Sequence, residues 1–381
     1  VGVDEHVRRI AIPVYKRTMH DKKGMLTEQP YGNDGEAIYS VSRSQMNVLL
    51  MDLAEKNGAN LYFNEKCVDL DFEKSIASFE NSLSRKKQNI TSDFIIGSDG
   101  AFSVVRSKMI ENYNHQYNYQ EIDHDYKELL IPPGENNTYL LDKNALHIWP
   151  RGNFMLMALA NLDGSFTCTL FAPKQGKNSF ANLNTKQEVE NFFSSTFPSF
   201  IELVPNLYNQ WETNPTSNLG IVKTYPWHVK DKSLLVGDAA HATVPFYGQG
   251  MNCGFEDCRI LNELLNNQED LNSCFAKFSK IRKLNADGIQ DLSMHNFIVM
   301  RDKTSDPKFL LQKKIEKKFS NLYPEKWTPL YSMVSFTNIP YNKAWEMGMK
   351  QDEIMQKIMS LPDIEKIWDN ESVMRKISSL M

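Results

Sequence analysis

The sequence lacks the features that would assign it to several classes of protein. It has no uninterrupted apolar run near the roughly 18 residues that a membrane-spanning helix needs. Lys and Arg together number 43 against 47 Asp and Glu, so the net charge of −4 offers no basic field for nucleic acid. The five cysteines are scattered at positions 67, 168, 253, 258 and 274, with no CxxC pair. A disulfide framework and a metal site are therefore not expected, and reduced thiols fit a reducing compartment.

The composition is that of a folded, multidomain protein. Hydrophobic residues make up 41% of the 381 residues, aromatic residues 11% and charged residues 24%, which is typical of globular chains and not of disorder. The length predicts two or three domains with substantial cores. The first residue is Val1 and no signal peptide precedes it, so we expect that the sequence begins inside a longer protein.

Periodicity of apolar residues predicts where strands and helices lie. Short alternating runs predict strands within 1–35 and at 61–63, 67–72, 75–80, 93–97 and 233–237. Apolar runs joined by turn residues predict an antiparallel meander within 126–172. Helical spacing predicts helices over 42–58, 186–213, 252–302 and most of 305–381. Strands that feed helices on both sides of a β-rich insert predict an α/β nucleotide-binding core interrupted by a sheet domain.

One strand at 93–97 leads into the turn Ser98-Asp99-Gly100. Glycine lets a backbone approach a ligand closely, and Asp99 could accept hydrogen bonds from a ribose or from backbone amides. Arg106, downstream, could meet a phosphate. An ordinary strand–turn–helix junction with a capping aspartate explains the same letters, so this motif alone leaves both interpretations open.

A second strand–turn–helix motif, at 234–252, is more specific. An apolar strand ends in Gly237-Asp238, which could hold a sugar hydroxyl, and the turn from Pro245 to Asn252 opens a helix. Free backbone N–H groups at a helix start attract an anionic ring or phosphate. A purely structural turn would not need so many small residues beside one aspartate, which favours a nucleotide-binding function.

Together, the two motifs make the chain resemble the FAD-dependent aromatic monooxygenases of the p-hydroxybenzoate hydroxylase fold. Within that group it is most similar to the kynurenine 3-monooxygenase family, through segments that follow the family's order along nearly the whole chain. These segments are 15–24, 29–47, 93–106, 146–167, 237–257 and 329–336.

The resemblance implies a set of substrate-binding residues. The family's arginine and tyrosine that hold the substrate carboxylate match Arg17 and Tyr31, and two bonds from a guanidinium with a third from a phenol suit a carboxylate. Taken alone, both residues would be ordinary surface or core side chains. The remaining implied positions, for the amino-acid tail and the ring, are Asn296, Tyr331, Phe246, Tyr247 and Gln249.

The resemblance also implies cofactor-binding residues, and it leaves the oxygen chemistry to the flavin, with no catalytic side chain. Arg43, at the start of a helix, matches an arginine that reaches the cofactor, and His241 is expected to be a structural hydrogen-bonding residue, not a base. The other implied cofactor positions are Cys67, Asp99, Val104, Asp238, Pro245, Gly250, Met251 and Asn252.

Several features depart from the family pattern. The glycine-rich dinucleotide fingerprint expected before Arg17 is absent, so we expect that about the first sixth of a family member is missing and that this piece could fail to retain FAD. Val299 stands where the family often has glutamate, and Tyr247 where phenylalanine is common. Eukaryotic members end in an apolar anchoring helix, and the chain stops at Met381 without one.

The implied reaction converts L-kynurenine, NADPH and O2 into 3-hydroxykynurenine, NADP and water, with FAD as cofactor and no nucleic-acid partner. The implied location is cytoplasmic, or the cytosolic face of the mitochondrial outer membrane in a eukaryote. The expected parts are substrate-sheet strands (1–35), a first FAD-binding part (36–110), a β-sheet substrate domain (111–218), a second FAD-binding part (219–302) and a helical C-terminal region (303–381). Two alternatives stay open: a related hydroxylase acting on a phenolic acid, and a catalytically dead scaffold.

Overall fold

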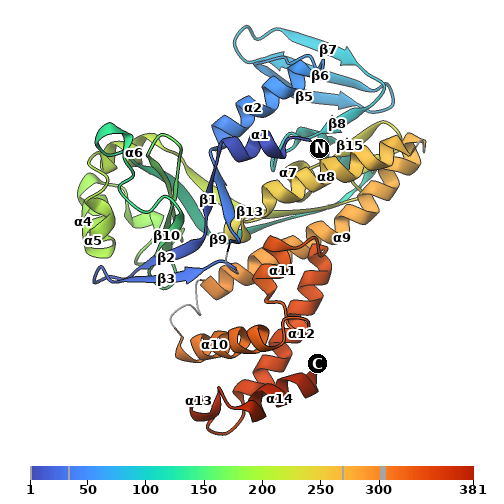
Figure 1. Cartoon of the computed structure of the whole chain (residues 1–381). Coiled ribbons are helices and arrows are strands. Elements are labelled where there is room, and N and C mark those ends of the chain that lie inside the picture. Colours follow the sequence, from blue (N-terminus) through green and yellow to red (C-terminus); the bar gives the residue numbers. More distant parts are fainter. Residues whose placement is uncertain (1, 33–34, 268–269, 301–305) are drawn as a thin grey trace. The chain divides into compact units, whose positions relative to one another are not determined.

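The computed structural model describes residues 2–32, 35–267, 270–300 and 306–381, which form two compact units (Figure 1). The first unit contains residues 1–61 and 121–219, and the second contains 62–120 and 220–381. Each unit is therefore assembled from two separate stretches of the chain, and the chain passes between the units three times.

The first unit is built on a mixed β-sheet with the strand order β13-β9-β12-β11-β10-β2-β3. Strands β2 and β10 are parallel, whereas β10–β11, β11–β12, β12–β9 and β2–β3 are antiparallel. The strands are β2 (Lys16–His20), β3 (Leu26–Pro30), β9 (Gln116–Ile131), β10 (Ala145–Pro150), β11 (Met155–Ala160), β12 (Phe166–Pro173) and β13 (Thr216–Tyr225). Strands β9 and β13 continue across the boundary into the second unit.

Helices cover one face of this sheet (Figure 1). They are α4 (Lys186–Thr196), α5 (Pro198–Ile201) and α6 (Leu207–Thr213). A capping box between Thr185 and Glu188 starts α4, and Phe193 from α4 packs in one apolar core with Leu156 and Leu170 of the sheet. A separate antiparallel pair joins β1 (Ala11–Val14) to β4 (Ile38–Val41), and the unit also holds α1 (Asp4–Arg9) and α2 (Arg43–Lys56).

The second unit contains two small sheets. In the order β14-β15-β8, strand β8 lies parallel to β15, and β5-β6-β7 form an antiparallel sheet. The strands are β5 (Glu65–Asp71), β6 (Ile76–Asn81), β7 (Lys87–Thr91), β8 (Ile95–Gly97), β14 (His228–Val229) and β15 (Ser233–Leu235). The parallel pair delivers both aspartate-containing turns from the same ends of neighbouring strands, which is where α/β folds bind nucleotides.

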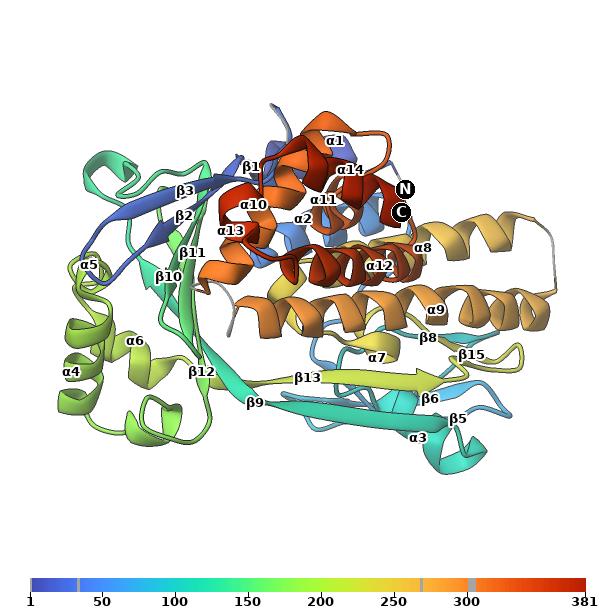
Figure 2. The same cartoon turned by 90° about the horizontal axis from the view of Figure 1, so that it is seen from below.

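Helices make up most of the second unit, and in Figure 2 the long α9 runs beside α8. The helices are α3 (Val104–Tyr113), α7 (Asp238–His241), α8 (Gly250–Asn266), α9 (Leu271–Ile298), α10 (Pro307–Leu322), α11 (Leu330–Phe336), α12 (Tyr341–Met359), α13 (Ile364–Ile367) and α14 (Glu371–Leu380). Short 3-10 turns lie at Glu135–Asn137 and Phe180–Asn182 of the first unit and at Pro245–Tyr247 of the second.

Helices α9 and α12 pack closely because Gly288 has no side chain. A Cβ added there would lie 2.5 Å from the backbone nitrogen of Asn342. Glycine at this position therefore allows the start of α12 to approach the buried face of α9. The contact matters because Tyr341, the first residue of α12, bonds Gln249 of the second aspartate motif.

Most of the expected secondary structure is confirmed, with two errors. The meander, the helices and the strands entering both aspartate turns are present. Residues 4–9, expected to belong to a strand region, form α1, and residues 61–63, expected to be a strand, lie outside any regular element. Residues 4–9 carry acidic residues in the first turn and basic residues in the last, which favours a helix, and the short apolar run at 61–63 has no paired strand. The five-part domain division stays a prediction, and its boundary at 302/303 lies outside the described residues.

Candidate functional site

The turn after β15 presents an exposed carboxylate at the start of a helix. Gly237 has φ 60° and ψ −144°, a conformation that L side chains rarely adopt, and Asp238 follows it as the first residue of α7. Asp238 is exposed, and no hydrogen bond or ion pair of its side chain is found among the described residues. The geometry suits a carboxylate that accepts a hydrogen bond from a ligand hydroxyl.

The first backbone N–H groups of helix α8 are left without partners inside the helix. The first helical bond runs from Cys253 N to Gln249 O at 2.9 Å, so the N–H groups of residues 250–252 have no partner within the helix. Gly248 is left-handed with φ 69°, and Met251 and Asn252 are exposed. A helix start of this kind, with exposed residues beside it, can hold an electron-rich or anionic group.

Asp99, in the turn after β8, caps α3. Its carboxylate accepts from Ser103 Oγ at 2.5 Å, from Val104 N at 2.7 Å and from Val105 N at 3.2 Å. The capping interpretation of this turn is therefore what the structure shows for Asp99. Direct cofactor contact by Asp99 and by the backbone of Val104 stays a prediction.

Arg106 does not face solvent as a phosphate ligand would, so the structure favours the structural interpretation of the two that the sequence left open. It is 3% exposed, and its guanidinium donates to Ala239 O at 2.7 Å and Ala101 O at 2.6 Å. The side chain therefore ties the turn after β8 to α7, the helix that begins with Asp238. Its position on a half-apolar helix gave no sign of this, because the partners are backbone carbonyls 5 and 133 residues away.

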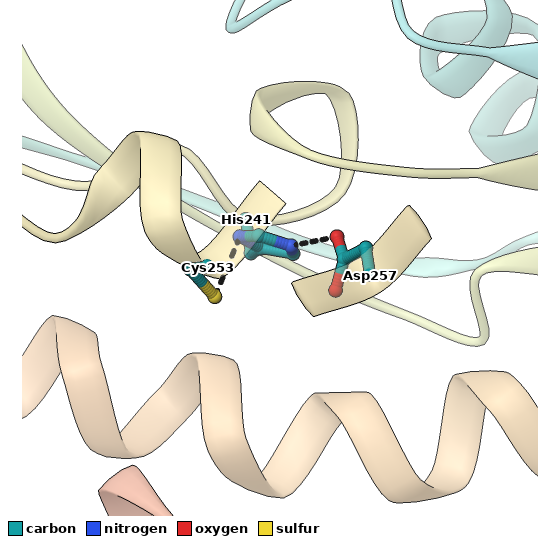
Figure 3. A group of neighbouring side chains, drawn as sticks. All are labelled: His241, Cys253 and Asp257. Carbon is teal, nitrogen blue, oxygen red and sulfur yellow. Dashed lines mark hydrogen bonds and ion pairs between the residues drawn. The ribbon is translucent and has the colours of Figure 1, made fainter. Parts of the chain in front are cut away.

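His241 lies in a buried polar cluster directly behind the second turn. Figure 3 shows its ring between Asp257 and Cys253, with Nε2 2.6 Å from Asp257 Oδ2 and Nδ1 3.9 Å from Cys253 Sγ. Burial by itself would lower the pKa of His241, but the Asp257 carboxylate raises it to about 10. Burial acts to raise the pKa of Asp257, and the cations His241 and Arg282 hold it below its usual range. This agrees with a structural role for His241.

The same three side chains have ligand atoms within 4.8 Å of one another, as a metal site would require. Arg282 neutralises the Asp257 carboxylate in place of a metal ion, because its Nε donates to Asp257 Oδ1 at 2.6 Å. The guanidinium supplies the positive charge that a metal ion would otherwise bring. We therefore interpret the cluster as an ion-pair network. Sequence reasoning missed Asp257 and Arg282, although a carboxylate four residues from Cys253 on a buried helix face signals a buried partner.

Aromatic side chains expected at the substrate ring lie together in the second unit. Tyr247 stacks on Tyr331 with ring centroids 5.6 Å apart, and Phe246 packs on Phe297 at 4.6 Å. Asn296 Nδ2 donates to the backbone oxygen of Phe246 at 2.6 Å. The structure thus brings together Phe246, Tyr247, Asn296 and Tyr331, and their contact with substrate stays a prediction.

Gln249 is fixed by a residue that sequence reasoning missed. Its Oε1 accepts from Tyr341 Oη at 3.0 Å and from Asn252 Nδ2 at 2.9 Å. Burial raises the pKa of Tyr341, so the phenol keeps its proton and donates. With Oε1 engaged twice, the Gln249 amide is oriented with its NH2 group as the remaining donor. No local signal in the sequence links Tyr341 to a glutamine 92 residues earlier.

Arg17 and Tyr31 are neighbours in the first unit. The guanidinium carbon of Arg17 lies 4.6 Å from the centroid of the Tyr31 ring, and Tyr31 is 7% exposed. Arg17 is on β2, opposite Gln29 of β3, so the sheet register brings the pair together. The structure places the two residues side by side, and their shared binding of a substrate carboxylate stays a prediction.

The remaining expected cofactor residues differ in environment. Arg43, at the start of α2, is exposed and pairs with Glu128 at 3.3 Å. Cys67 is half-buried on β5, and burial together with the nearby Asp99 raises the pKa of its thiol, so the side chain is not a reactive thiolate. Pro245 is exposed at the start of a 3-10 turn, and Gly250 begins α8. Their cofactor contacts stay predictions.

The whole chain matches curated relatives in its sequence. A protein of Flavobacterium johnsoniae named kynurenine 3-monooxygenase is 47% identical over 384 residues, covering 100% of this chain and 85% of the relative. Proteins of the same name from Myxococcus xanthus and Dictyostelium discoideum are each 40% identical and cover 96% of the chain. These matches cover 80% and 83% of the two relatives. The chain belongs to the kynurenine 3-monooxygenase family.

Two further comparisons agree with this membership. The family described as "FAD binding domain" matches residues 1–270. The fold is similar to that of a solved structure titled 2-methyl-3-hydroxypyridine-5-carboxylic acid oxygenase, with a TM-score of 0.64 and 18% sequence identity. The match covers 80% of this chain and 79% of the oxygenase chain. At that identity the likeness shows the fold alone. The fold class is thus confirmed as an α/β flavoprotein of the aromatic hydroxylase type with C-terminal helices, and the cofactor is FAD.

The residues present fit FAD. An exposed aspartate at a positive-φ glycine turn and the open N-terminus of a 17-residue helix are the donor and acceptor sets that a ribityl chain and an isoalloxazine need. In the part of the chain that the structure describes, no helix is both long and apolar enough to span a bilayer.

Proposed function

We propose that this member of the kynurenine 3-monooxygenase family catalyses the FAD-dependent, NADPH-consuming 3-hydroxylation of L-kynurenine by O2. The observation that carries the proposal is the 47% identity, across the entire chain, to a protein with that name. The adjacent Arg17 and Tyr31 support it, since an arginine–tyrosine pair suits a substrate with a free carboxylate. The reaction belongs to tryptophan degradation and the supply of precursors for NAD.

Recognition of the substrate would rest on side chains, while the cofactor supplies the redox chemistry. FAD, when bound, accepts reducing equivalents from NADPH and activates O2. Arg17 donates two parallel hydrogen bonds to the substrate carboxylate and the Tyr31 phenol adds a third. Asn296 and Tyr331 bind the amino-acid tail, and Phe246, Tyr247 and Gln249 lie along the aromatic ring.

Cofactor retention would rest mainly on the second unit. Asp238 would accept hydrogen bonds from a cofactor hydroxyl, and the backbone N–H groups of Gly250, Met251 and Asn252 would donate to the isoalloxazine. Arg43, Cys67, Asp99, Val104 and Pro245 complete the proposed set. Because the amine of kynurenine already activates the ring carbon beside it, positioning is the protein's main contribution and no strong base is required.

The test is L-kynurenine-dependent oxidation of NADPH by the full-length gene product that contains these residues, with the product identified by mass. We expect 3-hydroxykynurenine in proportion to the NADPH consumed, and no such stimulation by 4-hydroxybenzoate. NADPH consumption that yields only hydrogen peroxide would contradict the substrate and retain the flavoprotein. A protein that purifies without FAD and stays inert when FAD is added would overturn the proposal as a whole.

A matched pair of variants tests the cofactor-binding role of Asp238 independently of the substrate. Asp238→Asn should weaken FAD binding, whereas Asp231→Asn, a change of the same kind at a half-exposed turn carboxylate paired with Lys232, should not. Retention of FAD by Asp238→Asn at wild-type affinity would contradict the assigned role of Asp238.

A further inference from the structure

The polar cluster behind the second turn is buried far more deeply than the turn itself. Asp257 is 0% exposed, Arg282 is 1% exposed and His241 is 3% exposed, whereas Asp238 is exposed. Burying a carboxylate and a guanidinium is costly unless each finds partners, and an apolar pair of similar volume is often equally stable. The cost therefore calls for a role beyond filling the space between α8 and α9.

The carboxylate of Asp257 makes one bond that a simple ion pair would not need. Its Oδ2 accepts from the backbone N–H of Gly237 at 2.8 Å, and the same oxygen lies 2.6 Å from His241 Nε2. Its Oδ1 accepts from Arg282 Nε at 2.6 Å. Asp257 thus holds both ends of the short helix α7, Gly237 just before it and His241 as its last residue.

Arg282 in turn fixes Asp257 from a different helix. Its Nη2 donates to the backbone oxygen of Cys253 at 3.1 Å, one turn before Asp257 on α8. The guanidinium therefore clamps the carboxylate and the α8 backbone together, which leaves Asp257 Oδ2 with a fixed direction. Gly237, whose backbone N–H donates to that oxygen, has a positive φ and directly precedes Asp238.

From this chain of contacts, we propose that Asp257 and Arg282 are positioning residues that set the affinity for FAD without touching it, by holding the Gly237 amide and thereby aiming Asp238. The inference rests on the FAD-binding part of the proposed function and is independent of the substrate. It implies that the turn is preorganised in the absence of cofactor, so that little ordering is left to binding.

Substitution of Asp257 by asparagine tests the geometry because an amide has one acceptor and one donor side. If the amide oxygen accepts from the Gly237 N–H, the NH2 group faces the guanidinium of Arg282. If the amide oxygen accepts from Arg282, the NH2 group faces the Gly237 N–H. Either orientation sets a donor against a donor. Asp257→Asn should therefore raise the Kd for FAD about tenfold or more, measured by equilibrium dialysis without kynurenine.

A double substitution keeps the test valid if Asp257→Asn does not fold. With Arg282→Met added, the amide oxygen is free to accept from Gly237, so Asp257→Asn with Arg282→Met should regain much of the wild-type affinity. Asp257→Leu with Arg282→Met has no acceptor and should not. Asp291→Asn, which alters the half-exposed ion pair between Asp291 of α9 and Lys223 of β13, is the matched control and should leave the Kd unchanged.

The results that would overturn the inference are specific. A folded Asp257→Asn protein with FAD affinity within about twofold of wild type would contradict it, as would equal affinities for the two double variants. A purely structural role predicts lower melting temperatures with an unchanged Kd. In the wild-type apoprotein, fast exchange of the Gly237 amide that slows only when FAD is added would also overturn it. Failure of the full-length wild-type protein to bind FAD would instead defeat the proposed function.

Discussion

The guanidinium carbon of Arg17 lies 4.6 Å from the ring centroid of Tyr31, although 14 positions separate the two residues in the sequence. The antiparallel pairing of β2 with β3 places Lys16 opposite Pro30, the residue before Tyr31, and the backbone N–H of Tyr31 donates to Tyr15 O at 3.0 Å. A guanidinium stacked on an aromatic ring is held in one orientation, with its planar face against the ring.

Arg17→Lys should raise the KM for kynurenine about tenfold or more, even though the charge is kept. Lysine cannot make two parallel bonds to a carboxylate, and its stacking on Tyr31 is weaker. Steady-state kinetics with varied kynurenine measure the effect. Arg8→Lys is a matched control, because Arg8 also stacks on a tyrosine, Tyr39, at 5.2 Å in the same unit. A KM for Arg17→Lys equal to that of the control would remove Arg17 from the substrate site.

Tyr331→Phe should raise the KM for kynurenine several-fold. The stack on Tyr247, at 5.6 Å, needs only the ring, while the proposed bond to the substrate needs the hydroxyl. Kinetics and thermal unfolding on the same preparation separate the two. Tyr247→Phe is the control, and we expect a smaller effect from it. If Tyr331→Phe lowered stability without changing KM, the residue would be structural.

The free energy of unfolding should fall as the pH rises from about 6.5 toward about 10. Asp257 raises the pKa of His241 from 6.5 to about 10 in the folded protein. The stabilisation is therefore complete below pH 6.5, where both states are protonated, and is lost as the pH rises toward the folded pKa, by up to about 1.4 kcal/mol per pH unit. Denaturant unfolding across this range should show a flatter slope for His241→Gln than for the control His295→Gln. Equal slopes would show that His241 is not charged in the fold.

Gly288→Ala should destabilise the protein by about 1–3 kcal/mol, because the new methyl group would meet the α12 backbone, which cannot move alone. The nearest atom is Asn342 N at 2.5 Å. Gly254→Ala on α8 is the control, since its nearest non-local atom is 3.9 Å away, and it should be neutral or stabilising. Unfolding midpoints of the two variants decide the matter, and a Gly288→Ala protein as stable as the wild type would mean that α9 and α12 leave room for a methyl group.

The sequence by itself determined the strands, turns and helix starts around both aspartate motifs, because these depend on local patterns. An apolar run before Gly237-Asp238, and small residues before the helix at Gly250, dictate strand, turn and helix within a few residues. The family, and with it FAD, likewise followed from short segments in a fixed order along the chain, since each of these segments is recognised from its own residues.

The tertiary structure decided what the buried charges do. Arg106 and Arg282 look alike in sequence as helix-borne cations, and both could have been solvated or ligand-binding. The fold buries each of them and gives it partners that are distant in sequence: Ala239 O, 133 residues from Arg106, and Asp257, 25 residues from Arg282. Tyr341 and Gln249, 92 residues apart, are paired in the same way. Such partners depend on which helix faces pack together, and no local pattern encodes that packing.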